Sequence, residues 1–136
     1  LSWNSTAPTA TNFTVGALTQ VNRSGSTYVA YIFAHNAGGF GLTGTDNVIS
    51  CGSYTANGSG NATVNLGYEP QWVLRKTINV AGDWILLDNM RGYSVSGSDN
   101  YLLTNQNYSE QSLDLGNPTA TGFYLPMIIL NKPTST

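Results

Sequence analysis

The residues best suited to chemistry are seven carboxylates, spread along the 136 residues without a recognisable motif. Two facing carboxylates are the minimum for hydrolysing a glycosidic bond, one acting as an acid and the other as a base or nucleophile. The candidates are Asp46, Glu69, Asp83, Asp88, Asp99, Glu110 and Asp114. Their spacing selects no pair, so we predict no catalytic residue and a protein that is not an enzyme.

The sequence contains few side chains suited to metal binding or thiol chemistry. His35 and Cys51 stand alone, which excludes a zinc site of known spacing within one chain. Asp46–Asn47 and Asp99–Asn100 carry oxygen ligands suited to calcium, but they lack the spacing of a calcium-binding loop. We therefore predict no metal and no cofactor. Cys51 ends the apolar run 48–51, and a buried, inert thiol is the expected state.

Aromatic and polar side chains offer a different kind of site, a contact surface. Sugars stack on flat aromatic rings, while amide and carboxyl groups bind their hydroxyls. We select residues for contact with a glycan or a protein partner: Tyr54, Tyr93, Tyr108, Asp88 and Arg91. For Asp88 the competing interpretation is a carboxylate that caps its turn and pairs with Arg91 or Arg75. Trp72 and Trp84 lie within apolar segments, and we expect them in the core.

Composition points to a framework of strands. Charged residues make up 9% of the chain, against roughly 25% in an average protein, and Asn, Ser, Thr and Gly fill 59 of the 136 positions. Good helix formers are sparse, so we predict an all-β fold, an antiparallel β-sandwich close to a jelly roll. The net charge of −2 gives no basis for binding nucleic acid. The absence of a long apolar stretch predicts no membrane insertion.

Several segments have the pattern of strands. Residues 27–35 (TYVAYIFAH) are apolar on both alternating faces, which predicts a covered central strand, and a long loop should follow over 36–47. The segments headed by Trp72 and Trp84 predict a hairpin over 71–77 and 83–89. Further strands are expected at 48–54, 62–66 and 122–130, where Pro126 favours an edge position or a bend, and residues 101–103 are a short apolar anchor.

One short sequence occurs twice. Pro8–Phe13 (PTATNF) returns as Pro118–Phe123 (PTATGF), with five of six residues identical. We predict a single β-sandwich domain over residues 1–136. The repeat adds two hypotheses: that this domain is the C-terminal module of a longer chain, and that residues 1–35 are the end strands of a preceding repeat.

A string of short motifs in fixed order resembles a domain family of tailed-bacteriophage virion proteins, notably from phages of marine and cyanobacterial hosts. Residues 13–16 and 21–34 resemble the closing strands of that family, and residues 51–59 its opening hairpin. The motifs at 65–76, 82–84 and 88–92 follow in the same order. The resemblance covers about residues 10–123, and the sequence departs from it at Tyr124–Met127.

The resemblance implies a structural protein exposed on the virion, in a tail fibre or as a decoration of the capsid or tail. It carries over no catalytic residue. The expected partners are copies of the same chain, with a trimer as one hypothesis, and other virion proteins. The alternative is a carbohydrate-binding module that attaches the particle to glycans on the host surface.

Overall fold

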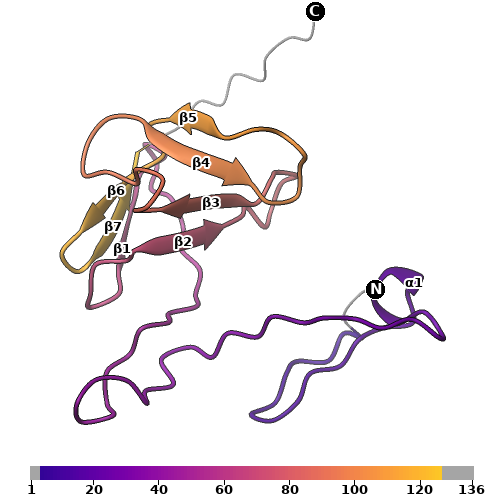
Figure 1. The fold of residues 1–136 in the computed structure, drawn as a ribbon. Helices are drawn as coiled ribbons and strands as arrows, with labels where there is room; N and C mark the ends of the chain where they lie inside the picture. Colours follow the sequence, from indigo (N-terminus) through magenta and orange to yellow (C-terminus); the bar gives the residue numbers. More distant parts are fainter. Residues whose placement is uncertain (1–3, 127–136) are drawn as a thin grey trace, which may run out of the picture. The chain divides into compact units, whose positions relative to one another are not determined.

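A computed structural model describes residues 4–126, and the chain divides into two compact units, residues 1–49 and 50–136. Every strand of the described part lies in the second unit, whereas the first contains one helical turn, α1 (Thr19–Asn22). Figure 1 shows this contrast between indigo-to-purple loops and the strands that follow them. Within the described residues, no helix has the length and apolar character needed to cross a membrane.

The first unit has almost no interior of its own. Among residues 4–49, Gly16 alone is buried. Residues 36–47 form the expected loop, closed by a bridge between Phe40 and Asp46. The prediction of a covered central strand over 27–35 is wrong, because this segment is exposed and belongs to no sheet. Apolar alternation makes a segment suited to pairing, but a strand forms only where a neighbour supplies the ladder.

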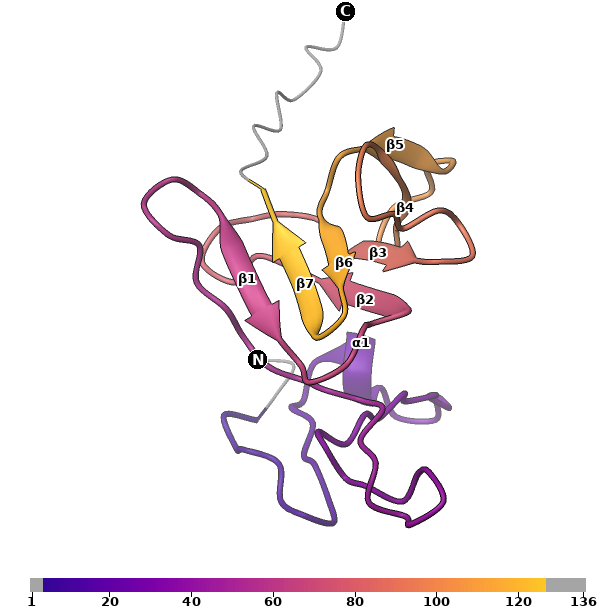
Figure 2. The ribbon, with the colours of Figure 1, turned by 90° about the vertical axis from the view of Figure 1, so that its left-hand side faces the viewer.

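Two antiparallel sheets make up the second unit. One sheet has the order β1-β7-β6, from β1 (Ala62–Asn65), β6 (Asn117–Thr119) and β7 (Gly122–Leu125). The other has the order β2-β3-β4-β5, from β2 (Trp72–Arg75), β3 (Ile85–Asp88), β4 (Asp99–Leu103) and β5 (Gln111–Leu113). Figure 2 shows β1, β7 and β6 side by side as one layer.

The predicted strands agree with this topology only in part. The β2–β3 hairpin is confirmed, with Val73 opposite Leu87, and so is the strand at β1. The expected strand over 48–54 is absent, and Cys51 within it is exposed, not buried. β7 lies between two neighbours and ends before Pro126, so the expected edge position is wrong; residues 127–130 of that prediction lie outside the described part. β4 was expected only as a short apolar anchor at residues 101–103, and the short strands β5 and β6 were not predicted.

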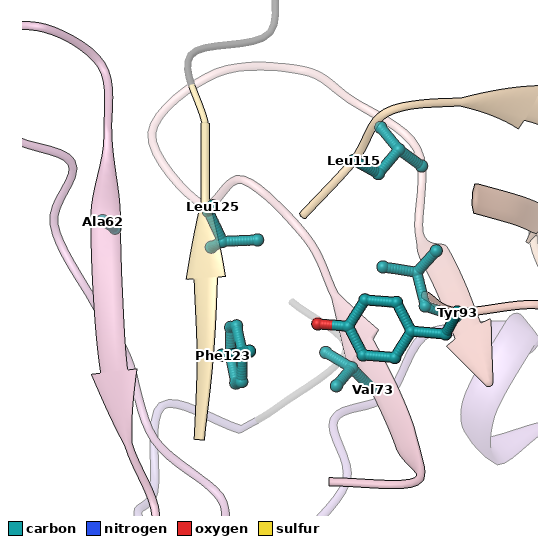
Figure 3. Packing of buried hydrophobic residues seen from close by; sticks show 7 residues of the cluster. Ala62, Val73, Tyr93, Leu115, Phe123 and Leu125 are labelled. Atoms are coloured by element: carbon teal, nitrogen blue, oxygen red, sulfur yellow. The ribbon is translucent and has the colours of Figure 1, made fainter. Parts of the chain in front are cut away.

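The core lies between the two sheets, which confirms the all-β sandwich. It contains seven buried residues drawn from both sheets and their loops: Ala62, Val73, Leu87, Tyr93, Leu115, Phe123 and Leu125. Figure 3 shows Phe123 and Leu125 pointing from β7 toward the side on which Val73 and Tyr93 lie. The inward-facing residues of β1, β2, β3 and β7 therefore meet in one apolar layer, as the period of two requires.

The repeated six-residue sequence adopts a tight turn in both places. In the second copy, Thr119 lies opposite Gly122 across the β6–β7 turn. In the first copy, Thr9 N–H donates to the Asn12 carbonyl oxygen at 2.8 Å, the same four-residue spacing. The copies differ at Gly122, where a Cβ would overlap the Val64 carbonyl oxygen of β1. Asn12 carries that Cβ, so a strand cannot approach the first turn as β1 approaches the second.

Candidate functional site

The three predicted contact tyrosines lie in different environments. Tyr108 is 63% exposed in the β4–β5 loop, and Tyr54 is 42% exposed with its ring edge-on to Phe123, 6.4 Å between centroids. The expected surface position of Tyr93 is wrong, since that residue is 5% exposed and packs in the core. Its backbone N–H donates to the Asp88 carbonyl oxygen at 3.0 Å, which closes the turn after β3 and directs the ring inward.

The Asp88–Arg91 pair is the turn-capping arrangement. Arg91 donates from its backbone N–H to Asp88 Oδ1 at 2.9 Å and from Nε to Oδ2 at 2.7 Å. Glu110, not selected from the sequence, lies on the other side of the guanidinium, with Oε2 3.7 Å from Nη1. Both carboxylate oxygens of Asp88 are therefore engaged within their own turn. Because the Arg91 side chain is exposed, the pair contributes little to stability, and it holds the loop in one conformation.

A polar cluster lies beside Trp84. Asp83 Oδ1 accepts hydrogen bonds from Asn105 Nδ2 at 2.8 Å and Gln106 Nε2 at 2.7 Å. Asn105 Oδ1 in turn accepts from the backbone N–H of Trp84 at 2.8 Å. The bond from Gln106, followed by that from Asn105, holds the pKa of Asp83 below its usual range, because both stabilise the ionised carboxylate.

A row of apolar side chains crosses the outer face of the four-stranded sheet, which the sequence did not indicate. The register places Leu74, Leu86 and Leu102 in one row across β2, β3 and β4. Their neighbours along each strand, such as Val73 and Leu87, face the core, so the leucine row faces the opposite side. The three leucines are half-buried.

Both tryptophans of this sheet belong to the same outer face. Trp72 lies opposite Asp88, and Trp84 extends β3 by one residue, its carbonyl oxygen accepting from Thr104 N–H at 3.1 Å. They are 48% and 42% exposed, so the expectation that they fill the core is wrong. Alternation explains the difference: each tryptophan is one residue out of phase with a core position, Val73 or Ile85. We call the surface formed by the leucine row and these two tryptophans the aromatic face.

Charged groups also enter the interior, where they fix loops. Asp99 is fully buried, and its two carboxylate oxygens accept from Ser94 N–H at 3.0 Å and Leu115 N–H at 2.9 Å. Arg75 Nη2 donates to the Leu115 carbonyl oxygen at 3.3 Å. Burial, and secondarily the nearby Asp99 carboxylate, raises the pKa of Tyr93 well above its usual value. The Tyr93 hydroxyl has no hydrogen-bond partner among the described residues.

The described part brings together no cluster of metal-ligating side chains, and a hollow lies beside β1. Residues 4–126 contain no group of three His, Cys, Asp or Glu side chains that could hold a metal ion. A hollow of about 290 Å³ beside β1 is lined by hydroxyl, amide and small side chains and by one ring: Thr55, Asn57, Asn61, Ala62, Thr63 and Tyr124. Asn57 Oδ1 already accepts from the Ser59 and Asn61 N–H groups, so its carbonyl group shapes the loop.

Fold and surface thus define a β-sandwich protein whose most conspicuous features are apolar surfaces. The chain belongs to a family described as a domain of unknown function (DUF7483), whose model matches residues 1–124. That match spans both compact units, so one family domain includes the exposed first unit as well as the sandwich. Comparison with curated proteins and with solved structures gave no match.

Proposed function

We propose that this chain is a non-enzymatic structural module of a tailed-bacteriophage particle, in a tail fibre or as a capsid or tail decoration. It acts by assembling with copies of itself and with other particle proteins, and it displays its loops on the particle surface. The motif order described above supports the phage setting. The many Asn, Ser and Thr side chains support assembly, because uncharged polar groups fit close interfaces without burying unpaired ions.

The observation that carries the proposal is segment 27–35. Val29, Tyr31 and Ile32 are 81%, 86% and 72% exposed, and they are large apolar side chains in neighbouring positions. Water-exposed apolar surface of this kind marks interaction sites. The unit that contains the segment buries only Gly16 among residues 4–49 and therefore cannot be stabilised by a core of its own.

Native mass measured by light scattering over a concentration series tests the assembly. We expect a defined oligomer in the wild-type chain and a lower mass after Tyr31→Lys, which places a charge where an apolar contact is expected. Ile78→Lys is the matched control, because Ile78 is also apolar and is 90% exposed, but lies in a loop of the sandwich. A chain that stays monomeric at every concentration contradicts the proposal.

The phage setting needs a separate test. Antibodies raised against the purified chain should label intact particles of a phage that encodes it, seen by electron microscopy. Labelling of host cells without particle labelling contradicts this part of the proposal.

A carbohydrate-binding module for attachment to host glycans is the second candidate, and the aromatic face favours it. Trp72 and Trp84 both expose their side chains on one side of a sheet, as stacking against sugar rings requires. A glycan array with the wild-type chain and a Trp72→Ser, Trp84→Ser double variant tests this function. Binding that disappears in the double variant supports it, and an array without signal contradicts it.

A further inference from the structure

Segment 28–32 has no protection against pairing with another chain. No Lys, Arg, Asp or Glu occurs between Arg23 and Asp46, and the same stretch contains no proline. Natural sheet edges are normally blunted by charges, prolines or bulges. β6, an edge strand of the sandwich, has such a device in Pro118, which cannot donate a backbone hydrogen bond. The exposed segment lacks it.

The order of side chains in the segment is complementary to itself. Reading Tyr28-Val29-Ala30-Tyr31-Ile32 against its own reverse places Tyr28 opposite Ile32 and Val29 opposite Tyr31, with Ala30 at the centre. Each outer pair joins an aromatic ring to a β-branched side chain, a favoured combination across antiparallel strands. The small Ala30 side chains meet where the two strands cross the symmetry axis.

We propose that two copies of this chain pair through residues 28–32 as antiparallel strands related by a two-fold axis at Ala30. The inference rests on the assembly proposed above and adds its partner and register. A two-fold contact needs a surface that is complementary to itself, which this order of residues provides. A register centred on Tyr31 would instead set two Tyr31 rings against each other and Ala30 against Ile32. It loses both aromatic–β-branched pairs of the register centred on Ala30 and gains only Val29–Phe33.

Single cysteines distinguish this register from others. In a Cys51→Ser background, which removes the exposed native thiol, Ala30→Cys places two thiols opposite each other across the axis. Directly opposed residues of antiparallel strands lie about 4.5–5.5 Å apart between Cα atoms, within reach of a disulfide. We expect a covalent dimer on a non-reducing gel after mild oxidation.

Ile32→Cys in the same background is the control. In the proposed register its two copies are four residues apart along the strands, about 14 Å at a rise of roughly 3.4 Å per residue, so no disulfide forms. A mixture of Val29→Cys and Tyr31→Cys chains should give a mixed dimer, because these positions are opposite each other.

The outcomes separate this inference from the proposed function. Cross-linking by Ala30→Cys together with its absence in Ile32→Cys supports the paired strands. A chain that is oligomeric by light scattering but fails to cross-link at Ala30, or that cross-links equally at Ile32, overturns the inference and leaves the assembly function in place. A chain that is monomeric throughout overturns both.

Discussion

Asp99 is expected to be the polar side chain on which the sandwich depends most. It is fully buried at the start of β4, and each carboxylate oxygen accepts one backbone N–H, from Ser94 and from Leu115. It therefore ties the loop before β4 to the loop after β5. The perturbation that tests this role is Asp99→Asn, which keeps the shape of the side chain and replaces one acceptor oxygen by an N–H₂ group.

The cost follows from the two hydrogen bonds. In Asp99→Asn one of the two backbone N–H groups faces another donor, and a buried donor left without a partner costs about 1–3 kcal/mol. Asp99→Ala removes both acceptors, which amounts to roughly 3–6 kcal/mol when each lost bond to a charged group is counted at about 1.5–3 kcal/mol. A domain is typically stable by about 5–15 kcal/mol, so the alanine variant is expected to be close to unfolding.

Urea unfolding followed by tryptophan fluorescence measures the effect, since Trp72 and Trp84 both lie in the sheet that contains Asp99. Asp114→Asn is the matched control, because it removes the same charge from an exposed residue next to Leu115 and should change stability by less than about 0.5 kcal/mol. We expect the midpoint to fall in Asp99→Asn and to stay in Asp114→Asn. Equal midpoints in the two variants refute the reasoning.

Three further predictions test other parts of the sandwich. Gly122→Ala should lower the urea midpoint by the equivalent of about 1–3 kcal/mol, because its Cβ would overlap a carbonyl group of β1. Gly58→Ala is the control and should leave the midpoint unchanged, since its Cβ meets open space. Similar midpoints in the two variants would contradict the close approach of β1 to Gly122. The pKa of Tyr93 is raised in the folded protein, so the fold favours the neutral hydroxyl. The contribution of this preference to the free energy of unfolding is complete below the unfolded pKa of about 10 and is lost as the pH rises above it. Urea midpoints at pH 7 and pH 11 should therefore show alkaline weakening in the wild type and less in Tyr93→Phe, and equal weakening counts against the buried hydroxyl. The pKa of Asp83 is lowered in the folded protein, so its contribution to stability is present above an unfolded pKa near 3.9 and is lost as the pH falls below it. NMR titration should show the pKa of Asp83 rising in Gln106→Ala. An unchanged pKa would be evidence against the hydrogen bond from Gln106.

The sequence predicted strand pairing in the sandwich between segments that are neighbours along the chain. The β2–β3 hairpin is an example, because two strands joined by a short connection are neighbours in roughly two-thirds of cases. Segment 27–35 shows the limit. A strand with two apolar faces is typically covered on both sides, but the pattern does not indicate which residues cover it. A sequence cannot separate a strand buried in its own chain from one that is completed by another chain.

The candidate site was predictable to a similar extent. The sequence offered a turn-capping Asp88 paired with Arg91 or Arg75 as one interpretation, and the structure has the pair with Arg91, three residues away. It could not place the tryptophans, since a shift of one residue in a strand moves a side chain from the core to the surface. Nor could it place Tyr93, whose ring is directed inward by a turn that the Tyr93 N–H closes on the Asp88 carbonyl oxygen. Nor could it identify Asp99, whose partner Leu115 is 16 residues away and contributes a backbone group that no side-chain motif records.

The difference between the two units is itself an argument for assembly. Residues 50–126 contain two antiparallel sheets with a buried apolar core between them. Residues 4–49 have one helical turn and a single buried residue, Gly16, and they leave the most apolar segment of the unit in water. Ordering those residues costs conformational entropy that no interior of their own offsets. If the chain assembles as proposed, contacts at the interface offset this entropy cost. The first unit should then resist proteolysis in the oligomer, and in Tyr31→Lys it should be digested before the sandwich.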